Sequence, residues 1–299
     1  MLDLQQYLKE RAVLIERALA AAVPPHDGLE ARLFEAMRYS LLDGGKRLRP
    51  ILALASCEAV GGSIDDAMSY ACALEMIHTY SLIHDDLPAI DNDDYRRGKP
   101  TCHKVFGEAV ALLAGDGLLT EAFRLMTHSH ATERSPGDEA LLLDLISEVA
   151  QAAGVSGMVG GQVVDIESEG KPVDLPTVQY IHTHKTGAMI LASVRVGARL
   201  GGAKETLLKA LTRYGESLGL SFQIADDILN VEGKAALMGK QTGTDLFKRK
   251  ATYPSVLGVE ESKIRSKELV EMAIDALKQL GPEADPLREI ARFIIAREY

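Results

Sequence analysis

The sequence predicts an all-α protein, and three observations support that fold class. Apolar residues recur at spacings of three and four along most of the 299 residues, as they do on the buried face of a helix. No segment shows the alternation of apolar and polar residues that indicates a half-buried strand. Trp is absent and aromatic residues form only 5% of the chain, a composition that also disfavours sheet.

Helical periodicity is clearest in four segments, which follow one another along the chain. In order, they are LEARLFEAMRYSLL at 29–42, DDAMSYACALEMIHTYSLIHDD at 65–86, EALLLDLISEVAQAAG at 139–154 and TGAMILASVRVGARLG at 186–201. Each is predicted to be a helix because its Ala, Leu, Ile and Met residues gather on one face.

Gly and Pro residues separate the predicted helices. The turn segments are VPPHDG at 23–28, DGGKRLRP at 43–50, VGGS at 60–63, ERSPGDE at 133–139, SEGKPVDLP at 168–176, LGGAKE at 200–205 and LGPEADP at 280–286. Many intervals are roughly 20 to 30 residues, longer than the usual helix of about a dozen. None of these turns has the composition of an interdomain linker, so we expect one domain over residues 1–299, built as a single large helical bundle.

Composition limits the partners and the compartment. The net charge is −10, and Lys and Arg occur in short local groups, so nucleic acid is not an expected partner. Three cysteines without CxxC spacing predict neither a disulfide framework nor a zinc site. The first residues are charged at short intervals, unlike a signal peptide, and no later run is expected to span a membrane. We therefore expect a soluble, cytoplasmic protein without stable membrane insertion.

An acidic run follows the apolar helical pattern at 65–86: the sequence at 81–99 is SLIHDDLPAIDNDDYRRGK. On an ideal helix, His78 and Ser81 lie about 20° and about 40° from Asp85, so the three share one face. Asp91 would lie about 120° away from that face. Pro88 changes the path of the chain, because it removes a backbone donor and clashes with the preceding turn. The carboxylates can then converge.

A second acidic pair lies far along the chain, in FQIADDILN at 222–230. It comprises Asp226 and Asp227, with Asn230 within about 40° of Asp226 on the helix. A single acidic run is more often a solvated helix end. Both runs here are embedded in apolar helices, and carboxylates that border a core usually have a cation. Hard oxygen ligands suit Mg²⁺, which commonly takes one or two carboxylates together with substrate phosphate oxygens.

Cationic residues recur near glycines around these acidic runs. They are Lys46 and Arg49 in GGKRLRP, Arg96 and Arg97 in DDYRRGK, Lys185 in HTHKTG, Lys240 in LMGKQTG, and KRK at 248–250. Arg matches phosphate oxygens with two hydrogen bonds, and Lys contributes a point charge. Glycine allows the backbone to approach a bulky anion. The combination predicts phosphate-binding sites.

These motifs resemble those of a known family. GGKRLRP, LIHDDLPAIDNDDYRRGKPTCH, GGQVVDIE, HKTG and FQIADDILN occur in the order found in trans-isoprenyl diphosphate synthases, specifically the short-chain farnesyl or geranylgeranyl diphosphate synthases of the bacterial type. The resemblance covers most of the chain. Pro88 and Ala89, inserted between the Asp pair and Asp91, are typical of the bacterial and plastid types.

The resemblance implies the isoprenoid synthase fold, a helical bundle around a central cavity with the two aspartate motifs facing each other at its mouth. It implies a cluster of three Mg²⁺ ions bound by Asp85, Asp91 and Asp226, with Asp86 and Asp227 as close supports. It also assigns substrate contacts and implies a homodimer. Lys46, Arg49, His78 and Arg97 would bind isopentenyl diphosphate; Arg96, Lys185 and Lys240 would bind the allylic diphosphate; Thr186 and Gln223 would flank its reactive carbon; and Lys250 matches a further family lysine.

The implied reaction is the Mg²⁺-dependent 1′–4 condensation of isopentenyl diphosphate with dimethylallyl or geranyl diphosphate, giving farnesyl diphosphate and diphosphate. It needs no nucleophilic side chain, because the allylic C–O bond ionises as cations accumulate negative charge on the leaving diphosphate. The isopentenyl double bond then attacks the allylic cation, and loss of a proton completes the product. A dry apolar pocket would keep water away from the cation.

Two positions bear on the details of this expectation. Asn230 stands where the family usually has Asp, and an amide keeps an acceptor but loses the charge, so we expect a role at that position through water or through another ligand. Tyr80 and Ser81 precede Asp85 and are candidates for setting product length. An aromatic residue at position 80 resembles farnesyl-type enzymes, although Tyr80 could also be ordinary core packing.

Other readings of the sequence stay open. A geranylgeranyl diphosphate synthase differs only in product length. An HD-type metal phosphohydrolase is suggested by HDD at 84–86 and would require more histidines, for which His182 and His184 are available. A terpene cyclase would share the ionisation residues but lack the isopentenyl site, and a non-catalytic helical scaffold would not need both acidic motifs. The glycines of GVSGMVGGQVVD at 154–165 predict either close helix packing or substrate access.

Overall fold

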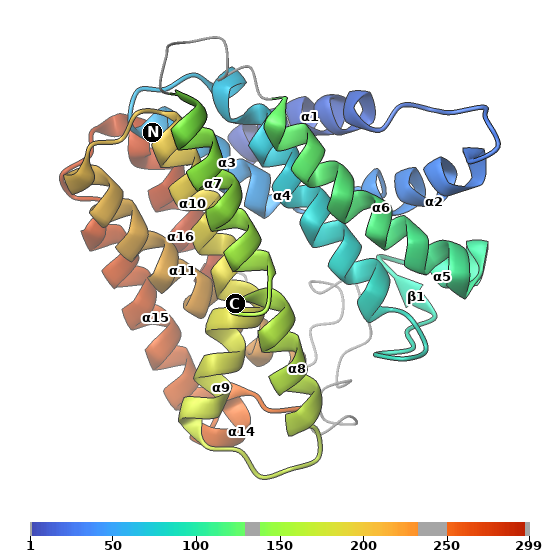
Figure 1. Cartoon of the computed structure of the whole chain (residues 1–299). Coiled ribbons are helices and arrows are strands. Elements are labelled where there is room, and N and C mark those ends of the chain that lie inside the picture. Colours follow the sequence, from blue (N-terminus) through green and yellow to red (C-terminus); the bar gives the residue numbers. More distant parts are fainter. Residues whose placement is uncertain (1, 129–137, 233–249, 297–299) are drawn as a thin grey trace.

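The structure of the protein, a computed structural model, describes residues 2–128, 138–232 and 250–296. Apart from turns and loops, these residues form helices and one short hairpin (Figure 1). The elements are α1 (Leu4–Ala22), α2 (Ala31–Leu41), α3 (Leu48–Ala59), α4 (Ile64–Asp85), β1 (Tyr95–Arg96), β2 (Lys99–Pro100), α5 (Cys102–Phe106), α6 (Glu108–Thr127), α7 (Asp138–Ala153), α8 (Met158–Ser168), α9 (Leu175–Ile181), η2 (His182–Gly187), α10 (Ala188–Leu200), α11 (Glu205–Val231), α14 (Tyr253–Leu257), α15 (Val259–Ala276), η3 (Pro282–Ala284) and α16 (Asp285–Ala296). The prediction of an all-α fold is confirmed.

The centre of the bundle is formed by α3, α4, α10 and α11. Helix α4 is buried on nearly all sides, as expected for a helix whose apolar residues do not form a single stripe. Helix α10 crosses α3 closely, because a Cβ added at Gly197 would lie 1.9 Å from the carbonyl oxygen of Ala53. Helix α11 packs against α10 on one side and α15 on another. The four predicted helical segments correspond to α2, α4, α7 and α10.

Helix α4 ends at Asp85, three residues before Pro88. A proline disfavours helical geometry in the residue before it, and the chain leaves the helix in a turn that brings the Asp91 amide 2.8 Å from the Asp85 carbonyl oxygen. The predicted change of path is confirmed. It returns Asp91 to the end of α4.

The described residues include one short hairpin, for which the sequence showed no alternating pattern. Tyr95 pairs with Pro100 and Arg96 with Lys99 in an antiparallel hairpin. Its two turn residues are Arg97 and Gly98, with φ angles of 53° and 79°, and positive φ at both positions is the geometry that joins two-residue hairpins with the correct twist. The strands are too short for an alternating pattern to be visible in the sequence.

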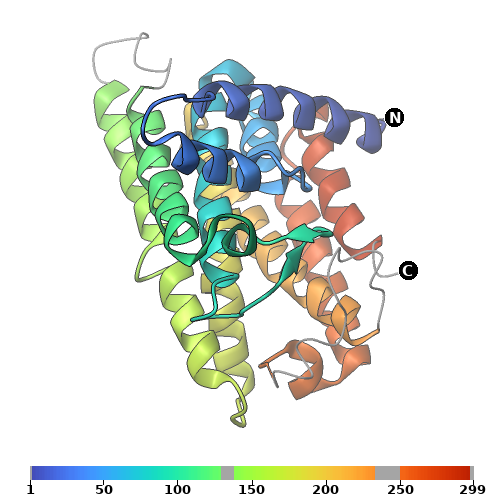
Figure 2. The ribbon, with the colours of Figure 1, turned by 90° about the vertical axis from the view of Figure 1, so that its right-hand side faces the viewer.

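One apolar stretch also differs from expectation. Glu139–Ser168, which includes most of α7 and all of α8, is long and apolar enough to cross a membrane by length and composition alone, and 33% of its most apolar window is buried. Core helices of soluble proteins pass the same test. Figures 1 and 2 place α6, α7 and α8 on one side of the bundle, where several of their apolar side chains are exposed.

Candidate functional site

A cavity of about 370 Å³ lies where the C-terminal end of α4 meets the hairpin, α8, η2 and α11. Its lining is both acidic and basic, with an apolar part formed by Leu82, Ile181, Phe222 and Leu229. Most of the candidate residues line it. They are Lys46, Arg49, His78, Asp85, Asp91, Arg96, Arg97, Lys185, Thr186, Gln223, Asp226, Asp227 and Lys250.

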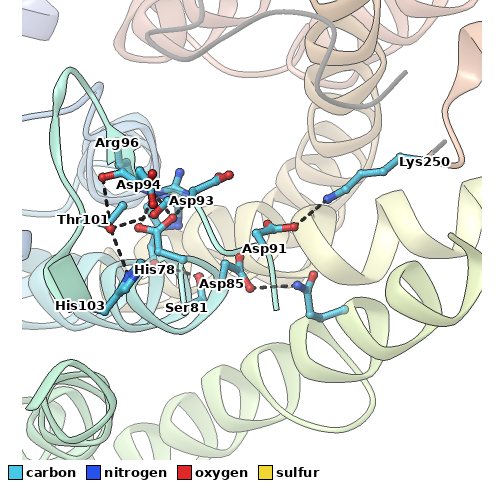
Figure 3. Close-up of polar contacts among 12 residues, drawn as sticks. His78, Ser81, Asp85, Asp91, Asp93, Asp94, Arg96, Thr101, His103 and Lys250 are labelled. Carbon is cyan, nitrogen blue, oxygen red and sulfur yellow. Dashed lines mark hydrogen bonds and ion pairs between the residues drawn. The ribbon is translucent and has the colours of Figure 1, made fainter. Parts of the chain in front are cut away.

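The first acidic motif, at the end of α4, contacts α8 and the segment that begins at Lys250. Gln162 on α8 donates a hydrogen bond from Nε2 to Asp85 Oδ1 at 2.9 Å. Asp91 lies beyond it, and its Oδ1 is 3.5 Å from Lys250 Nζ (Figure 3). Burial raises the pKa of Asp85, Lys185 opposes the shift, and the nearby charge of Asp91 adds to it. Two carboxylates close together in a partly dry site favour a bound cation.

The second acidic motif has two different roles on one helix. Asp226 faces the cavity. Asp227 is 4% exposed and connects three elements: Gln223 Nε2 on α11 is 3.3 Å from Oδ1, His182 Nε2 on η2 is 3.3 Å from Oδ2, and the Tyr253 amide of α14 donates to Oδ2 at 2.9 Å. These contacts tie α11 to η2 and α14.

Asn230 does not line the cavity with Asp226. It is 3% exposed and faces a second hollow, lined also by Lys171, Val173 and Ser255. The helical spacing placed Asn230 close to Asp226 on one face, but Asn230 lines the second hollow, which shares Asp227 and Lys250 with the cavity.

A π-helix positions Lys185 and Thr186. In η2 the helix widens by one residue, a feature that occurs often at functional sites. Lys185 Nζ donates to Asp165 Oδ2 at 2.6 Å, and Thr186 Oγ1 donates to Gln223 Oε1 at 2.9 Å. A Cβ added at Gly161 would lie 2.3 Å from the Lys185 amide nitrogen. Gly161 therefore allows α8 to pack closely against η2. Of the two roles predicted for the glycines at 154–165, close helix packing applies at this position, not substrate access.

The basic end of the cavity is formed by Lys46, Arg49, His78 and Arg97. Burial lowers the pKa of His78 well below its ordinary value, and the charges of Arg49 and Arg97 lower it further, so His78 is neutral in the folded protein. The Nε of Arg49 is buried and has no hydrogen-bond partner among the described residues. A buried donor of this kind is available to an anion.

The hairpin brings Arg97 to this end. Arg97 Nη1 donates to the carbonyl oxygen of Gly44 at 2.6 Å, and a Cβ added at Gly45 would lie 2.6 Å from Arg97 Nη2. Gly45 has a φ of 114°, which side chains rarely adopt. Glycine is thus required at position 45 both by the backbone and by the approach of the guanidinium.

Arg96 points to the acidic side. Its Nε lies 2.9 Å and 2.8 Å from the two carboxylate oxygens of Asp86, and both residues are partly or fully buried. Asp86 itself does not line the cavity, so it acts through Arg96. The two adjacent arginines are divided between the two ends of the site by the turn that follows Arg96.

The two candidates for product length, Tyr80 and Ser81, lie away from the cavity lining. Tyr80 is 7% exposed and packs edge-on against His84, with ring centroids 5.6 Å apart. Ser81 Oγ donates to the His78 carbonyl oxygen at 2.9 Å. Neither lines the cavity. Lys240, with Lys248 and Arg249, lies outside the described residues.

The histidines exclude one alternative. His84 points at α6, where its Nε2 is 2.9 Å from the Leu112 carbonyl oxygen, and His184 stacks on Tyr180 with ring centroids 3.8 Å apart. Neither faces the cavity, and His182, which does line it, pairs with Asp227. The described residues therefore do not gather the set of histidines that an HD-type phosphohydrolase site requires. In the described parts of the chain, no three His, Cys, Asp or Glu side chains are grouped so as to hold a metal by themselves.

Several residues at the site were missed or undervalued by sequence reasoning. Phe222 and Ile181 form part of the apolar lining, and His182 bridges η2 to Asp227. His182 precedes Lys185 by three residues, which places both on one helical turn, but its partner is 45 residues away. No local pattern indicates that contact.

Comparison with known proteins gives consistent results. The sequence model of the family described as polyprenyl synthetase matches residues 30–283. The geranylgeranyl diphosphate synthase of Cyanophora paradoxa is 48% identical over 99% of this chain and 97% of its own length. The farnesyl diphosphate synthase of Geobacillus stearothermophilus is 47% identical over 100% of this chain and 99% of its own.

A solved structure agrees with the sequence relatives. The apo crystal structure of an FPP/GFPP synthase from Zymomonas mobilis superposes with a TM-score of 0.86 and 40% sequence identity, covering 98% of this chain and 99% of that chain. The helical bundle is therefore shared along nearly the whole length. This chain belongs to the polyprenyl synthetase family.

Proposed function

We propose that the protein is a prenyltransferase that condenses isopentenyl diphosphate with an allylic diphosphate, head to tail, and releases diphosphate. One observation carries the proposal: a single cavity holds carboxylates from two helices between two separate groups of cations. Two diphosphate groups require two such groups of cations. The names of the relatives, which include farnesyl and geranylgeranyl diphosphate synthases, support the same reaction class.

The isopentenyl diphosphate group is assigned to the basic end, where Lys46, Arg49, His78 and Arg97 meet. A neutral His78 donates one hydrogen bond, while the lysine and the arginines neutralise phosphate charge. The buried Arg49 Nε gains the partner that it lacks in the protein alone. A terpene cyclase would have no use for this second basic group, so the condensation is favoured over cyclisation.

The residues at the acidic end fit Mg²⁺. Asp85, Asp91 and Asp226 offer hard carboxylate oxygens to one cavity, and a divalent cation would relieve the repulsion that contributes to the raised pKa of Asp85. Because Mg²⁺ takes the remaining ligands from substrate phosphate and water, the site needs no third protein ligand around each ion. We propose three Mg²⁺ ions, which when bound supply charge neutralisation to the leaving diphosphate.

The chain's own cations act on the same leaving group. Lys185 and Lys250 lie beside Asp165, at 2.6 Å and 3.8 Å from its Oδ2, and Arg96 is held by Asp86. Positive charge fixed in this way stabilises the diphosphate as the allylic C–O bond breaks, without reorganisation at the moment of reaction. Lys240, outside the described residues, is proposed to join them.

The reaction then needs groups that tolerate a carbocation. Thr186 and Gln223 are hydrogen-bonded to each other and present neutral oxygens, which stabilise positive charge without forming a bond to carbon. The isopentenyl double bond supplies the electron pair of the new C–C bond. One proton then leaves the adjacent carbon for the departed diphosphate, and a new allylic double bond remains. The apolar lining of Leu82, Ile181, Phe222 and Leu229 excludes water.

Farnesyl diphosphate is the proposed product, with geranylgeranyl diphosphate as the alternative. The support is the aromatic Tyr80, which occupies α4 five residues before Asp85 and is buried. Tyr80 does not line the cavity, so we propose that the allylic tail extends along α4 as far as this ring, which would limit the length of the tail. Relatives of both product classes are similarly close to this chain.

We also propose that the chain is a single cytoplasmic domain that forms a homodimer through the face of α6, α7 and α8. Apolar side chains gather on that face: Leu112, Leu113, Leu143, Val155, Val159 and Val163 are 43% to 84% exposed. Exposed apolar groups of this extent indicate an interaction surface.

Product analysis tests the proposed function. The protein is incubated with Mg²⁺, isopentenyl diphosphate and, in turn, dimethylallyl, geranyl or farnesyl diphosphate, and the products are separated by chain length. Elongation that stops at the fifteen-carbon product is expected. Release of phosphate, or a cyclic hydrocarbon without elongation, would reject the assignment.

A further inference from the structure

We propose that Arg47 and Glu75 form a buried ion pair that positions the isopentenyl diphosphate site, although neither side chain lines the cavity. The inference rests on the proposed function and extends it to two residues outside the cavity. Arg47 lies between Lys46 and Arg49 in the sequence. Glu75 lies on α4, three residues before His78.

Arg47 is turned away from the cavity and is held on all sides. Its side chain is fully buried. Nη1 donates to Glu75 Oε1 at 2.7 Å, and Nη2 donates to the Leu41 carbonyl oxygen at 2.7 Å. Nε and Nη2 both donate to Glu16 Oε1, at 2.9 Å and 2.7 Å. One guanidinium thus ties the start of α3 to α1, to the end of α2 and to α4.

The backbone at this position needs such an anchor. Gly44, Gly45 and Arg47 have φ angles of 69°, 114° and 47°, so three of four consecutive residues are in conformations with positive φ. A non-glycine residue persists there only when its surroundings fix it. This turn sends Arg47 inward and leaves Lys46 and Arg49 facing the cavity. The buried contacts of Arg47 therefore set the direction of both phosphate-binding cations.

Glu75 also influences the cations that it does not touch. It is 2% exposed. Burial lowers the pKa of Arg49 and of Arg97, and in both cases the charge of Glu75 is the strongest that opposes the shift. One buried carboxylate thus offsets the mutual repulsion of Arg47, Arg49 and Arg97 before a diphosphate arrives. Without Glu75, the repulsion among the positive charges of the basic end would be less compensated.

The two roles predict a selective defect. Removing one partner of a buried ion pair leaves an uncompensated charge, whereas replacing both removes that penalty. Glu75→Gln and Arg47→Met should each disturb the turn that carries Lys46 and Arg49. Neither touches the carboxylates of the acidic end, so recognition of the allylic diphosphate should be preserved.

Steady-state kinetics with both substrates tests the inference. We expect each single variant to raise KM for isopentenyl diphosphate about tenfold, with KM for the allylic diphosphate changed less than about twofold. The double variant should recover part of the loss, which measures the coupling of the pair. Arg47→Lys keeps the charge but loses the planar set of donors, so it should raise KM for isopentenyl diphosphate by an intermediate amount. This variant also provides a test if Arg47→Met does not fold.

Glu148→Gln is the matched control, because Glu148 pairs with Arg195 and Arg199 between α7 and α10, away from the cavity. It should lower Tm and leave the ratio of the two KM values unchanged. The inference is overturned if the Arg47 and Glu75 variants behave like this control, or if both KM values rise together. If the unsubstituted protein does not elongate an allylic diphosphate, the proposed function fails first, and that result is read before any variant is made.

Discussion

At the scale of single residues, Asp85 and Asp226 come from two helices that contribute to the core, and both line the same cavity. Their neighbours Asp86 and Asp227 have turned to protein partners instead: Arg96 for one, and Gln223, His182 and the Tyr253 amide for the other. Each aspartate pair therefore has one member that faces the cavity and one that is bonded to several protein groups, although Asp227 also borders the cavity. We propose that the first member of each pair binds the ligand and that the second supports the site.

Asp226→Asn tests this division. The substitution keeps the size of the side chain and removes the charge, so we expect kcat to fall about 100-fold or more, while Tm changes little. Asp275→Asn on α15, where the carboxylate is 68% exposed, is the control and should keep normal activity. Steady-state rates at saturating Mg²⁺ decide it; normal kcat in the Asp226 variant would remove this carboxylate from the ionisation step.

Tyr80→Ala tests the limit on product length. Removing the ring opens space one turn beyond the carboxylates, so the product distribution should shift from fifteen carbons to twenty or more. Tyr80→Phe keeps the bulk of the side chain and should keep the shorter product. Chromatography of the dephosphorylated products measures the shift. A product that stays at fifteen carbons would mean that Tyr80 is core packing.

At the scale of elements, the site is built where regular structure is interrupted. Helix α4 ends before Pro88. In the hairpin, Arg96 is the last residue of β1 and Arg97 is the first residue of the turn. At Lys185, the helix takes the wider π geometry of η2. Gly161 allows α8 to pack closely against η2. This packing sets the position of Lys185 on η2 relative to Asp165 on α8, to which Lys185 is hydrogen-bonded. Several of the functional side chains are thus placed by interruptions of regular structure, whereas Gln223 and Asp226 project from the continuous helix α11.

Gly161→Ala should show how much this crossing matters. The new methyl group would overlap the Lys185 backbone at 2.3 Å, so α8 and η2 must separate, and we expect both Tm and kcat to fall. Gly117→Ala on α6 is the matched helical control, because its Cβ would meet only the flexible end of Met37 at 3.1 Å; it should keep its activity. Thermal unfolding and turnover are measured on both. Equal behaviour of the two variants would contradict the role given to the crossing.

These breaks also mark the limit of prediction from sequence. The spacing of apolar residues predicted α2, α4, α7 and α10, because each is long and buries apolar residues over several turns, α4 on nearly all sides. The hairpin has two residues in each strand, too few to show alternation, and a π-helix leaves no period of its own. The pairs Arg47 with Glu75 and His182 with Asp227 join residues 28 and 45 positions apart, and no local pattern links them.

At the scale of the whole molecule, the cavity lies among residues of α4, α8, η2 and α11. The face formed by α6, α7 and α8 (Figure 1) carries exposed apolar side chains. The motifs of the acidic and basic ends were recognisable in the sequence because each requires a particular residue type at a particular spacing. The surface was not, since the helices that form it have the same periodicity as those of the core.

Leu113→Asp should weaken the proposed dimer. It places a charge on the exposed face of α6, where the leucine is 55% exposed, and burial of an unpaired carboxylate at an interface is unfavourable. Met272→Asp on α15, at 56% exposure, is the matched control and should leave the molar mass unchanged. Sedimentation equilibrium gives the mass of each. A wild-type protein of 32 kDa in solution would contradict the dimer itself.

The central claim is that one cavity binds two diphosphates and joins their carbon chains. The most direct test is a single reaction with isopentenyl and geranyl diphosphates, in which the farnesyl product and the released diphosphate are both quantified. We expect equal amounts of the two, and neither when Mg²⁺ is removed by a chelator. Diphosphate released without a matching amount of elongated product would contradict the claim.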